Sequence, residues 1–398
     1  MSRWLRAMVA TAVAIVAMGC GADVLGGGSY RWVDGTRHER EPSARTVTLR
    51  WRQRLVPEMD EAFVPVERAR AALDPERDRI YVGSSAGQLW ALTAAGGRVY
   101  TYDAGGSIAA EPAFDARANE LYLGTEDGVI HRLAALDGAV SWRTEVGGAI
   151  SNAPILTDDA VYVITDDDVV TALDRTSGEA LWRFRRDAPE GFTISQHSGI
   201  TMVEGKLLAG FTAGQVVALT PADGSLIWER DTSVDIEPGP DGSARFADVD
   251  TTPVVEDGVV YVASFAAGMY ALELASGSVL WRDEELTGVT AIVPASERML
   301  VLSSGDLGIL CIDRESRDIL WRKRLARGAP SIPYVTDELV LFGESQGGFV
   351  TLALQDGREL GRFEQQHGFT AQPAFHLGRG FVLSNGGTLL AFAVPGAR

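Results

Sequence analysis

The amino-acid sequence predicts an all-β chain that folds as a closed, eight-bladed β-propeller of four-stranded antiparallel blades. Three observations support this prediction. Short apolar runs of alternating polarity recur between turn residues, as in residues 259–282, and such runs are typical of antiparallel strands. The pattern repeats every 40 to 53 residues, which indicates a radial or solenoid array. Eight starts of the repeating unit can be counted, and the eighth unit lacks one strand.

Each repeat has a fixed position in its last strand, which tryptophan fills in five copies: Trp142, Trp182, Trp228, Trp281 and Trp321. Two degenerate copies carry Thr101 and Gly361 there. Four residues earlier stands Gly97, Gly138, Gly178, Gly224, Gly277 or Gly357, and Arg317 is the one departure. We expect each tryptophan to pack over the neighbouring blade. The glycine should supply the unusual backbone angle of a hairpin turn.

The unit starts near Ile80, Leu121, Val161, Leu207, Val260, Met299, Leu339 and Gly380. Proline-containing segments before several of these starts can form an innermost strand: residues 111–114, 153–156, 252–255 and 372–375. The eighth unit ends at residues 391–394 after three strands. We predict that residues 46–55 supply the missing outer strand and close the ring, which removes the exposed sheet edges. An open solenoid is the alternative, but it leaves this deficit unexplained.

The first residues predict an export signal and a lipid anchor. Two arginines precede an apolar stretch at residues 7–18, which is too short for a permanent membrane span. The motif AMGC, which ends at Cys20, resembles the bacterial lipobox, so residues 1–19 are expected to be a lipoprotein signal peptide and Cys20 the lipidated residue. Gly21 follows the cysteine and favours the periplasmic face of the outer membrane. An ordinary secretory signal is the alternative.

Composition agrees with an exported body on a tether. Residues 20–45 contain a glycine run and no apolar periodicity, so we expect a flexible tether before a propeller that spans residues 46–398. The formal net charge of −18 does not suit nucleic acid or anionic lipid headgroups as partners. If Cys20 carries lipid, Cys311 has no partner for a disulfide and is expected to be a small buried apolar residue.

No residue pattern predicts catalysis, a metal or a bound cofactor. The matches to G-x-S-x-G at residues 83–87 and 343–347 occupy hairpin-turn positions, whereas a nucleophile elbow needs a strand-to-helix turn. The five histidines show no metal-ligand spacing. The acidic turns at residues 158–159 and 166–168 could attract a cation, but no calcium-loop pattern accompanies them. We therefore expect a protein that is not an enzyme.

Two insertions interrupt the repeat, at residues 184–199 and 229–249, after the outer strands of blades three and four. In an up-and-down meander, all outer-to-inner connections lie on one face of the ring. Consecutive blades should therefore place the two insertions side by side, and neighbouring long loops on a rigid scaffold favour a binding site. Two solvated insertions without a function are the alternative.

The residue types in the insertions favour binding to another protein. Phe192 and Ile194 are apolar residues in a polar connection. Arg245, Asp248 and Asp250 can add directional charge pairing beside them. Apolar anchors with charged neighbours are typical of protein-binding patches.

The repeat resembles the PQQ-like propeller repeat. With the lipobox and the stretch DVDTTPVV at residues 248–255, it resembles the BamB family of outer-membrane assembly lipoproteins over essentially the whole chain. This resemblance implies a non-catalytic scaffold of the β-barrel assembly machinery that contacts the barrel subunit BamA, and other subunits of the complex, through the two loops.

The resemblance can be carried to individual residues of the loops. Phe192 and Ile194 match the family's apolar pair, and Asp248 and Asp250 match its aspartates. Ser195 stands where the family has an arginine, and Arg245 lies close enough in the sequence to supply the positive charge.

Two other functions stay open at this point. A periplasmic propeller of this repeat type could bind a small ligand or a quinone cofactor, although the chain lacks the adjacent cysteines common in quinoprotein dehydrogenases. The chain could also be a scaffold of another envelope complex. A bound chromophore, or a central channel lined by Arg, Asp and Trp, would favour the cofactor.

Overall fold

The computed structural model divides into two compact units, Met1–Ser43 and Ala44–Arg398. Its described residues are 31–33, 36–38, 47–57, 64–186, 197–236, 246–325 and 327–394. Within them, no helix is long and apolar enough to cross a membrane.

The first unit contains a short hairpin, in which β1 (Arg31–Val33) pairs with β2 (Thr36–His38) in antiparallel fashion. Both strands fall in residues 20–45, the stretch that was expected to be a flexible tether. The two residues between the strands are Asp-Gly, a pair that favours a tight hairpin turn and that could have revealed the hairpin.

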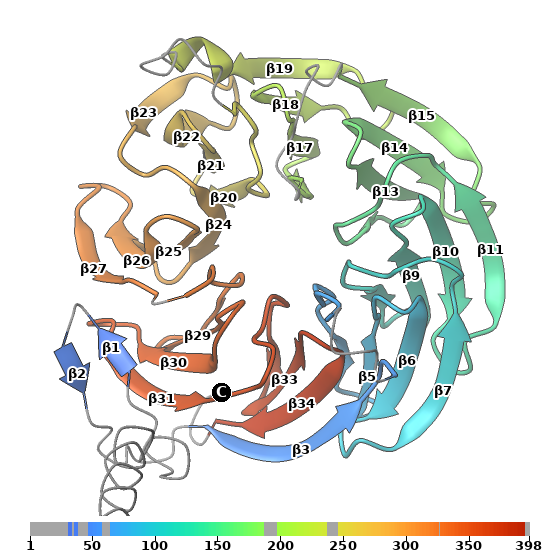
Figure 1. Cartoon of the computed structure of the whole chain (residues 1–398). Helices are drawn as coiled ribbons and strands as arrows, with labels where there is room; N and C mark the ends of the chain where they lie inside the picture. Colours follow the sequence, from blue (N-terminus) through green and yellow to red (C-terminus); the bar gives the residue numbers. More distant parts are fainter. Residues whose placement is uncertain are drawn as a thin grey trace, which may run out of the picture. The chain divides into compact units, whose positions relative to one another are not determined.

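The second unit is built from eight four-stranded antiparallel sheets, each an up-and-down meander. Figure 1 shows them arranged around a ring, with the first strand of each meander innermost. The first four blades are β4 (Ala72–Asp74), β5 (Arg79–Val82), β6 (Gln88–Thr93), β7 (Arg98–Asp103); β8 (Ala113–Asp115), β9 (Glu120–Gly124), β10 (Val129–Ala134), β11 (Val140–Glu145); β12 (Ile155–Leu156), β13 (Ala160–Thr165), β14 (Val169–Asp174), β15 (Ala180–Arg185); and β16 (Ile200–Val203), β17 (Lys206–Gly210), β18 (Gln215–Leu219), β19 (Leu226–Asp231).

A 3₁₀ turn, η1 (Ser233–Asp235), follows blade 4. The remaining blades are β20 (Val254–Glu256), β21 (Val259–Ser264), β22 (Gly268–Glu273), β23 (Val279–Asp283); β24 (Val289–Pro294), β25 (Met299–Ser304), β26 (Gly308–Asp313), β27 (Ile319–Lys323); β28 (Tyr334–Val335), β29 (Leu339–Gly343), β30 (Phe349–Ala353), β31 (Glu359–Phe363); and β32 (Ala374–His376), β33 (Arg379–Ser384), β34 (Thr388–Ala393) with β3 (Thr48–Arg54). The eight predicted unit starts lie at or next to the first residue of the second strand in each blade, which confirms the count.

The N-terminal strand of the ring closes the last blade, as predicted. β3 pairs with β34 in a register from Thr48 opposite Ala393 to Arg54 opposite Thr388. The indole side chain of Trp51 then contacts blade 1, where its Nε1–H donates to the carbonyl oxygen of Ala94 (3.0 Å). The two ends of the propeller are thus joined in one sheet, and the solenoid alternative is wrong.

The repeated tryptophans fill the space between neighbouring blades. The Nε1–H of Trp142 donates to the Arg175 carbonyl oxygen of the next blade (3.1 Å), and Trp321 donates in the same way to Leu354 (2.6 Å). A Cβ added at Gly178 would lie 2.6 Å from the Trp142 ring, so this turn needs glycine for close approach as well as for its φ of +76°. The expected role of the repeat is confirmed.

Two turns depart from the expected glycine position. In blade 1, Gly96 takes the positive φ (+90°) in place of Gly97, because this turn is built one residue earlier. In blade 6, Arg317 adopts a φ of +68° at the position where other blades have glycine. A non-glycine residue in this region stores backbone strain, so blade 6 is the irregular repeat.

Apolar side chains pack between blades, so the core is divided among the seams of the ring. One such cluster joins Leu208 and Val216 of blade 4 to Val260 and Leu272 of blade 5, all fully buried. Cys311 is buried without a disulfide in the seam between blades 6 and 7, as expected. The fold is therefore a rigid frame of repeated packing contacts.

The two G-x-S-x-G matches form hairpin turns, as predicted. The amide of Gly87 donates to the carbonyl oxygen of Ser84 (3.0 Å) between β5 and β6, and Gly347 donates to Glu344 (3.0 Å) between β29 and β30. Neither turn leads into a helix. In the described part of the chain, no three His, Cys, Asp or Glu side chains are grouped to hold a metal ion.

Candidate protein-binding site

The two insertions leave and re-enter the propeller on the same face, next to each other. The hydroxyl of Ser198 donates to the carbonyl oxygen of Thr251 (3.0 Å), and the amide of Gly199 donates to Oγ1 of Thr252 (2.9 Å). The Thr201 hydroxyl also donates to the Pro253 carbonyl oxygen. These bonds tie the end of the first insertion to the end of the second, so the expected neighbourhood of the two loops is present at their bases.

The first insertion is fixed at both ends by a buried aspartate. Asp168 has a φ of +60° in the turn between β13 and β14 and is 1% exposed. Its carboxylate accepts hydrogen bonds from the backbone amide and hydroxyl of Thr212. Its carbonyl oxygen accepts from the Arg186 amide (3.1 Å), and its Oδ1 lies 4.0 Å from Nδ1 of His197. Burial raises the pKa of Asp168 above its ordinary value.

The second insertion begins at a polar anchor around η1. The Asp235 carboxylate accepts hydrogen bonds from Arg230 (2.6 Å) and from the Tyr270 hydroxyl (2.9 Å) of blade 5. Arg282, also in blade 5, donates to the Asp235 carbonyl oxygen (3.1 Å). Burial opposes ionisation, but the hydrogen bonds and nearby arginines outweigh it and lower the pKa of Asp235. The chain therefore leaves blade 4 along a path fixed by blade 5.

The second insertion ends at Phe246, which is 44% exposed and packs edge-on against Phe265 with ring centroids 6.3 Å apart. Its backbone is then pinned to the turn after β21. The Ser264 hydroxyl donates to the Ala247 carbonyl oxygen (2.9 Å), and the Phe265 amide donates to that of Asp248 (2.8 Å). Phe246 is thus a partly exposed aromatic on a rigid base.

Asp248 and Asp250 are buried in this structure, at 2% and 8% exposure. Burial and the neighbouring Asp248 carboxylate raise the pKa of Asp250 to about 8. The sequence treated these carboxylates as surface groups, but the backbone bonds of residues 247–249 to blades 4 and 5 hold this segment inside the seam. Burial and the Asp248 charge thus favour the protonated form of Asp250.

Four of the predicted site residues lie outside the described residues: Cys20, Phe192, Ile194 and Arg245. Their roles stay predictions. Sequence reasoning missed Phe246, although an aromatic residue directly after Arg245 in a polar loop was a usable signal. It also missed the anchor made by Asp168 and His197, because their proximity arises only from the packing of blade 3 against blade 4.

Sequence comparison identifies related proteins. A model of the family described as outer membrane protein assembly factor BamB matches residues 101–306 and 269–396. The protein of that name from Yersinia pestis is 27% identical over 279 residues, which cover 70% of this chain and 70% of that protein. The one from Escherichia coli is 26% identical over 321 residues, covering 78% and 81%.

Solved structures share the fold. The crystal structure of BamB from Moraxella catarrhalis superposes with a TM-score of 0.71 at 21% identity, covering 87% of this chain and 99% of that one. A quinohemoprotein alcohol dehydrogenase from Pseudomonas putida gives 0.65 at 13% identity, covering 89% and 77%. At these identities the likeness extends to the propeller alone, so the scaffold is common to assembly factors and redox enzymes.

Proposed function

The chain belongs to the family of the outer membrane protein assembly factor BamB, and on this basis we propose that it is a non-catalytic scaffold in the assembly of outer membrane proteins. Relatives from Yersinia pestis and Escherichia coli carry that name over 70% or more of both chains. A scaffold role accords with a ring whose repeated residues serve packing. The protein would act at the periplasmic face of the outer membrane.

The partner we propose is a BamA-type barrel subunit, bound through the two insertions. Phe192 and Ile194 would provide apolar anchors, with Phe246 as a third at the edge of the fixed base. The observation that carries this proposal is the pair of hydrogen bonds from Ser198 and Gly199 to the end of the second insertion. They tie the bases of the two insertions together, and anchors on a preorganised base would lose little entropy on binding.

The charged residues would supply specificity at this surface. Asp248 and Asp250 would take part in polar contacts with the partner at the end of the second insertion, as the family resemblance implies. Arg245 would contribute a positive charge at the rim. A pairing of this kind favours one orientation of the partner over others.

Lipid attachment at Cys20 would keep this surface near its membrane partner. A change of Cys20 to serine removes the thiol that accepts the lipid, so the full chain should move from the membrane to the soluble fraction. Unchanged membrane association in the presence of high salt would contradict the anchor.

The docking surface is tested by co-purification of the barrel subunit from solubilised outer membranes. The double change Phe192→Ala and Ile194→Ala should reduce recovery of the subunit at least tenfold, because buried anchors dominate interface energy. Leu136→Ala is the matched control: Leu136 is 55% exposed, in the turn between β10 and β11 on the other face of the ring. Equal recovery with both variants, at unchanged unfolding midpoints, would refute the assignment.

A further inference from the structure

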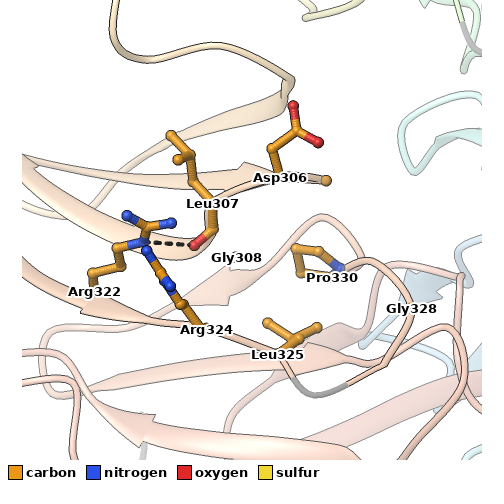
Figure 2. A pocket seen from close by; sticks show the side chains of 9 residues that line it. Asp306, Leu307, Gly308, Arg322, Arg324, Leu325, Gly328 and Pro330 are labelled. Carbon is orange, nitrogen blue, oxygen red and sulfur yellow. Dashed lines mark hydrogen bonds between the residues drawn. The ribbon is translucent and has the colours of Figure 1, made fainter. Parts of the chain in front are cut away.

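A pocket of about 400 Å³ is formed by blade 6 and its connection to blade 7, on the face of the ring from which the insertions leave. Its walls are the turn between β25 and β26, the residues at the end of β27, and the connection to β28 (Figure 2). Two arginines, Arg322 and Arg324, line it together with Leu307, Leu325 and Pro330. The volume is in the range of sites that hold a small ligand or a single peptide side chain.

Arg322 lies in β27, and Arg324 follows the last residue of that strand. The neighbouring side chains of Trp321 and Lys323 contact blade 7 and do not line the pocket: a Cβ on Gly357 would touch the Trp321 ring, and Nζ of Lys323 lies 3.4 Å from Glu359. Figure 2 shows the guanidinium groups of Arg322 and Arg324 directed to the same part of the pocket. Nε of Arg322 donates to the Leu307 carbonyl oxygen (2.9 Å), which leaves its terminal nitrogens for a ligand.

Neither arginine forms an ion pair with any residue that the structure describes. Asp306 also lines the pocket, but its carboxylate is directed elsewhere: a Cβ added at Gly288 would lie 2.7 Å from its Oδ2. Figure 2 shows this carboxylate pointing away from the arginines. The pocket therefore holds two positive charges that its own acidic residue does not offset.

The neighbouring blades show how the repeat otherwise treats this arginine. In blade 5, Arg282 donates to the Asp235 carbonyl oxygen and lies 3.9 Å from Glu284. In blade 7, Arg362 is buried between Glu344 and Glu359. In blade 6, no described acidic side chain pairs with Arg322. A second arginine, Arg324, lines the same pocket. In a chain of net charge −18, this is a local reversal of the prevailing sign.

We propose that this pocket binds a carboxylate carried by a peptide segment. The planar forks of two guanidinium groups match a carboxylate, which can accept two hydrogen bonds from each. Leu307, Leu325 and Pro330 give an apolar wall for a side chain next to that carboxylate. A bilayer surface with many anionic headgroups would be repelled by the acidic protein, whereas a single carboxylate meets mainly the local positive charge. The site is independent of the docking surface on the insertions.

The test is calorimetric titration of the full chain with three short peptides. Acetyl-leucyl-aspartyl amide offers a side-chain carboxylate, and acetyl-leucyl-leucine offers a terminal one. Acetyl-leucyl-asparaginyl amide is the neutral control. At least one acid should bind roughly tenfold more tightly than the control, since charge-assisted hydrogen bonds are about twice as strong as neutral ones. The preferred acid identifies the source of the carboxylate.

Variants locate the binding. Arg322→Gln and Arg324→Gln should each weaken the preferred acid roughly tenfold, because each removes one guanidinium fork. Arg143→Gln is the matched control, since Arg143 also follows the repeat tryptophan but lies in blade 2, away from this pocket. Equal binding of acids and the neutral control, or equal loss with Arg143→Gln, would overturn the proposal. So would tighter binding of inorganic phosphate or of anionic vesicles at the same arginines.

Discussion

The buried carboxylate of Asp250 should make the folded chain less stable as pH rises. Its pKa is raised from 3.8 to about 8 by burial and by Asp248. Between these values the folded chain keeps a proton that the unfolded chain has released. The folded state then binds more protons than the unfolded state, and the free energy of unfolding falls with rising pH across this window. Asp250→Asn removes the titration and should remove this loss.

The size of the effect follows from the shift in pKa. Each tenfold change in the acid dissociation constant corresponds to about 1.4 kcal/mol, so the rise from 3.8 to about 8 sets an upper bound of roughly 6 kcal/mol. Relaxation and water entry around the carboxylate at high pH reduce this value, and we expect a difference of about 1–3 kcal/mol between Asp250→Asn and the parent at pH 9. Near pH 4 the side chain at position 250 is neutral in the folded state of the parent and of Asp250→Asn. The difference in stability between the two proteins should therefore vanish there.

Urea denaturation at pH 4.5, 7 and 9 measures this difference. Asp250→Asn should become progressively more stable than the parent as pH rises. Asp248→Asn should recover part of the same gain, because it removes the neighbouring charge that raises the pKa of Asp250. Asp158→Asn is the control, since the Asp158 side chain is 91% exposed. A gain for Asp250→Asn that is the same at all three pH values would refute the reasoning.

Three further changes test the frame. Trp321→Ala should lower the free energy of unfolding in urea by about 3–5 kcal/mol, because it empties a seam between blades, while Leu320→Ala, at an exposed site, should cost under about 1 kcal/mol. Arg362→Met should cost about 3–5 kcal/mol by leaving Glu344 buried without its arginine, and Glu344→Gln in the same chain should restore part of the loss. A chain without β3 should elute as aggregates in size-exclusion chromatography, because β34 becomes an open edge; a stable monomer would contradict closure by that strand.

The ring could be predicted from the sequence because its determinants are local and repeated. The alternation of strands such as β21, the turn glycines and the tryptophan position each recur, so errors at one repeat are corrected by the others. Even closure by β3 followed from counting strands. The same regularity explains why Gly97 was predicted as the turn glycine of blade 1 when Gly96 takes the positive φ. A pattern drawn from all the repeats does not show a shift of one residue in a single turn.

The candidate sites were harder to predict because they depend on contacts between distant segments. Burial of Asp248 and Asp250 is set by hydrogen bonds from Ser264 and Phe265, and no sequence period encodes it. The unpaired charge of Arg322 beside its pocket can be recognised only when the equivalent arginines of blades 5, 6 and 7 are compared in the structure. A run of basic residues at 322–324 stood in the sequence, but only the structure separates Lys323, which pairs with Glu359, from its two neighbours.

The two proposed sites can be separated by experiment, because their described residues belong to different blades. The base of the insertions belongs to blades 3 to 5, whereas Arg322 and Arg324 line a pocket of blade 6 and its connection to blade 7. The double change Arg322→Gln and Arg324→Gln should therefore leave recovery of the barrel subunit within about twofold of the parent, since sites without shared contacts act additively. The change Phe192→Ala should in turn leave binding of the acidic peptide unaltered. Loss of both activities in either variant, with the fold intact, would mean that one continuous interface covers this face of the ring.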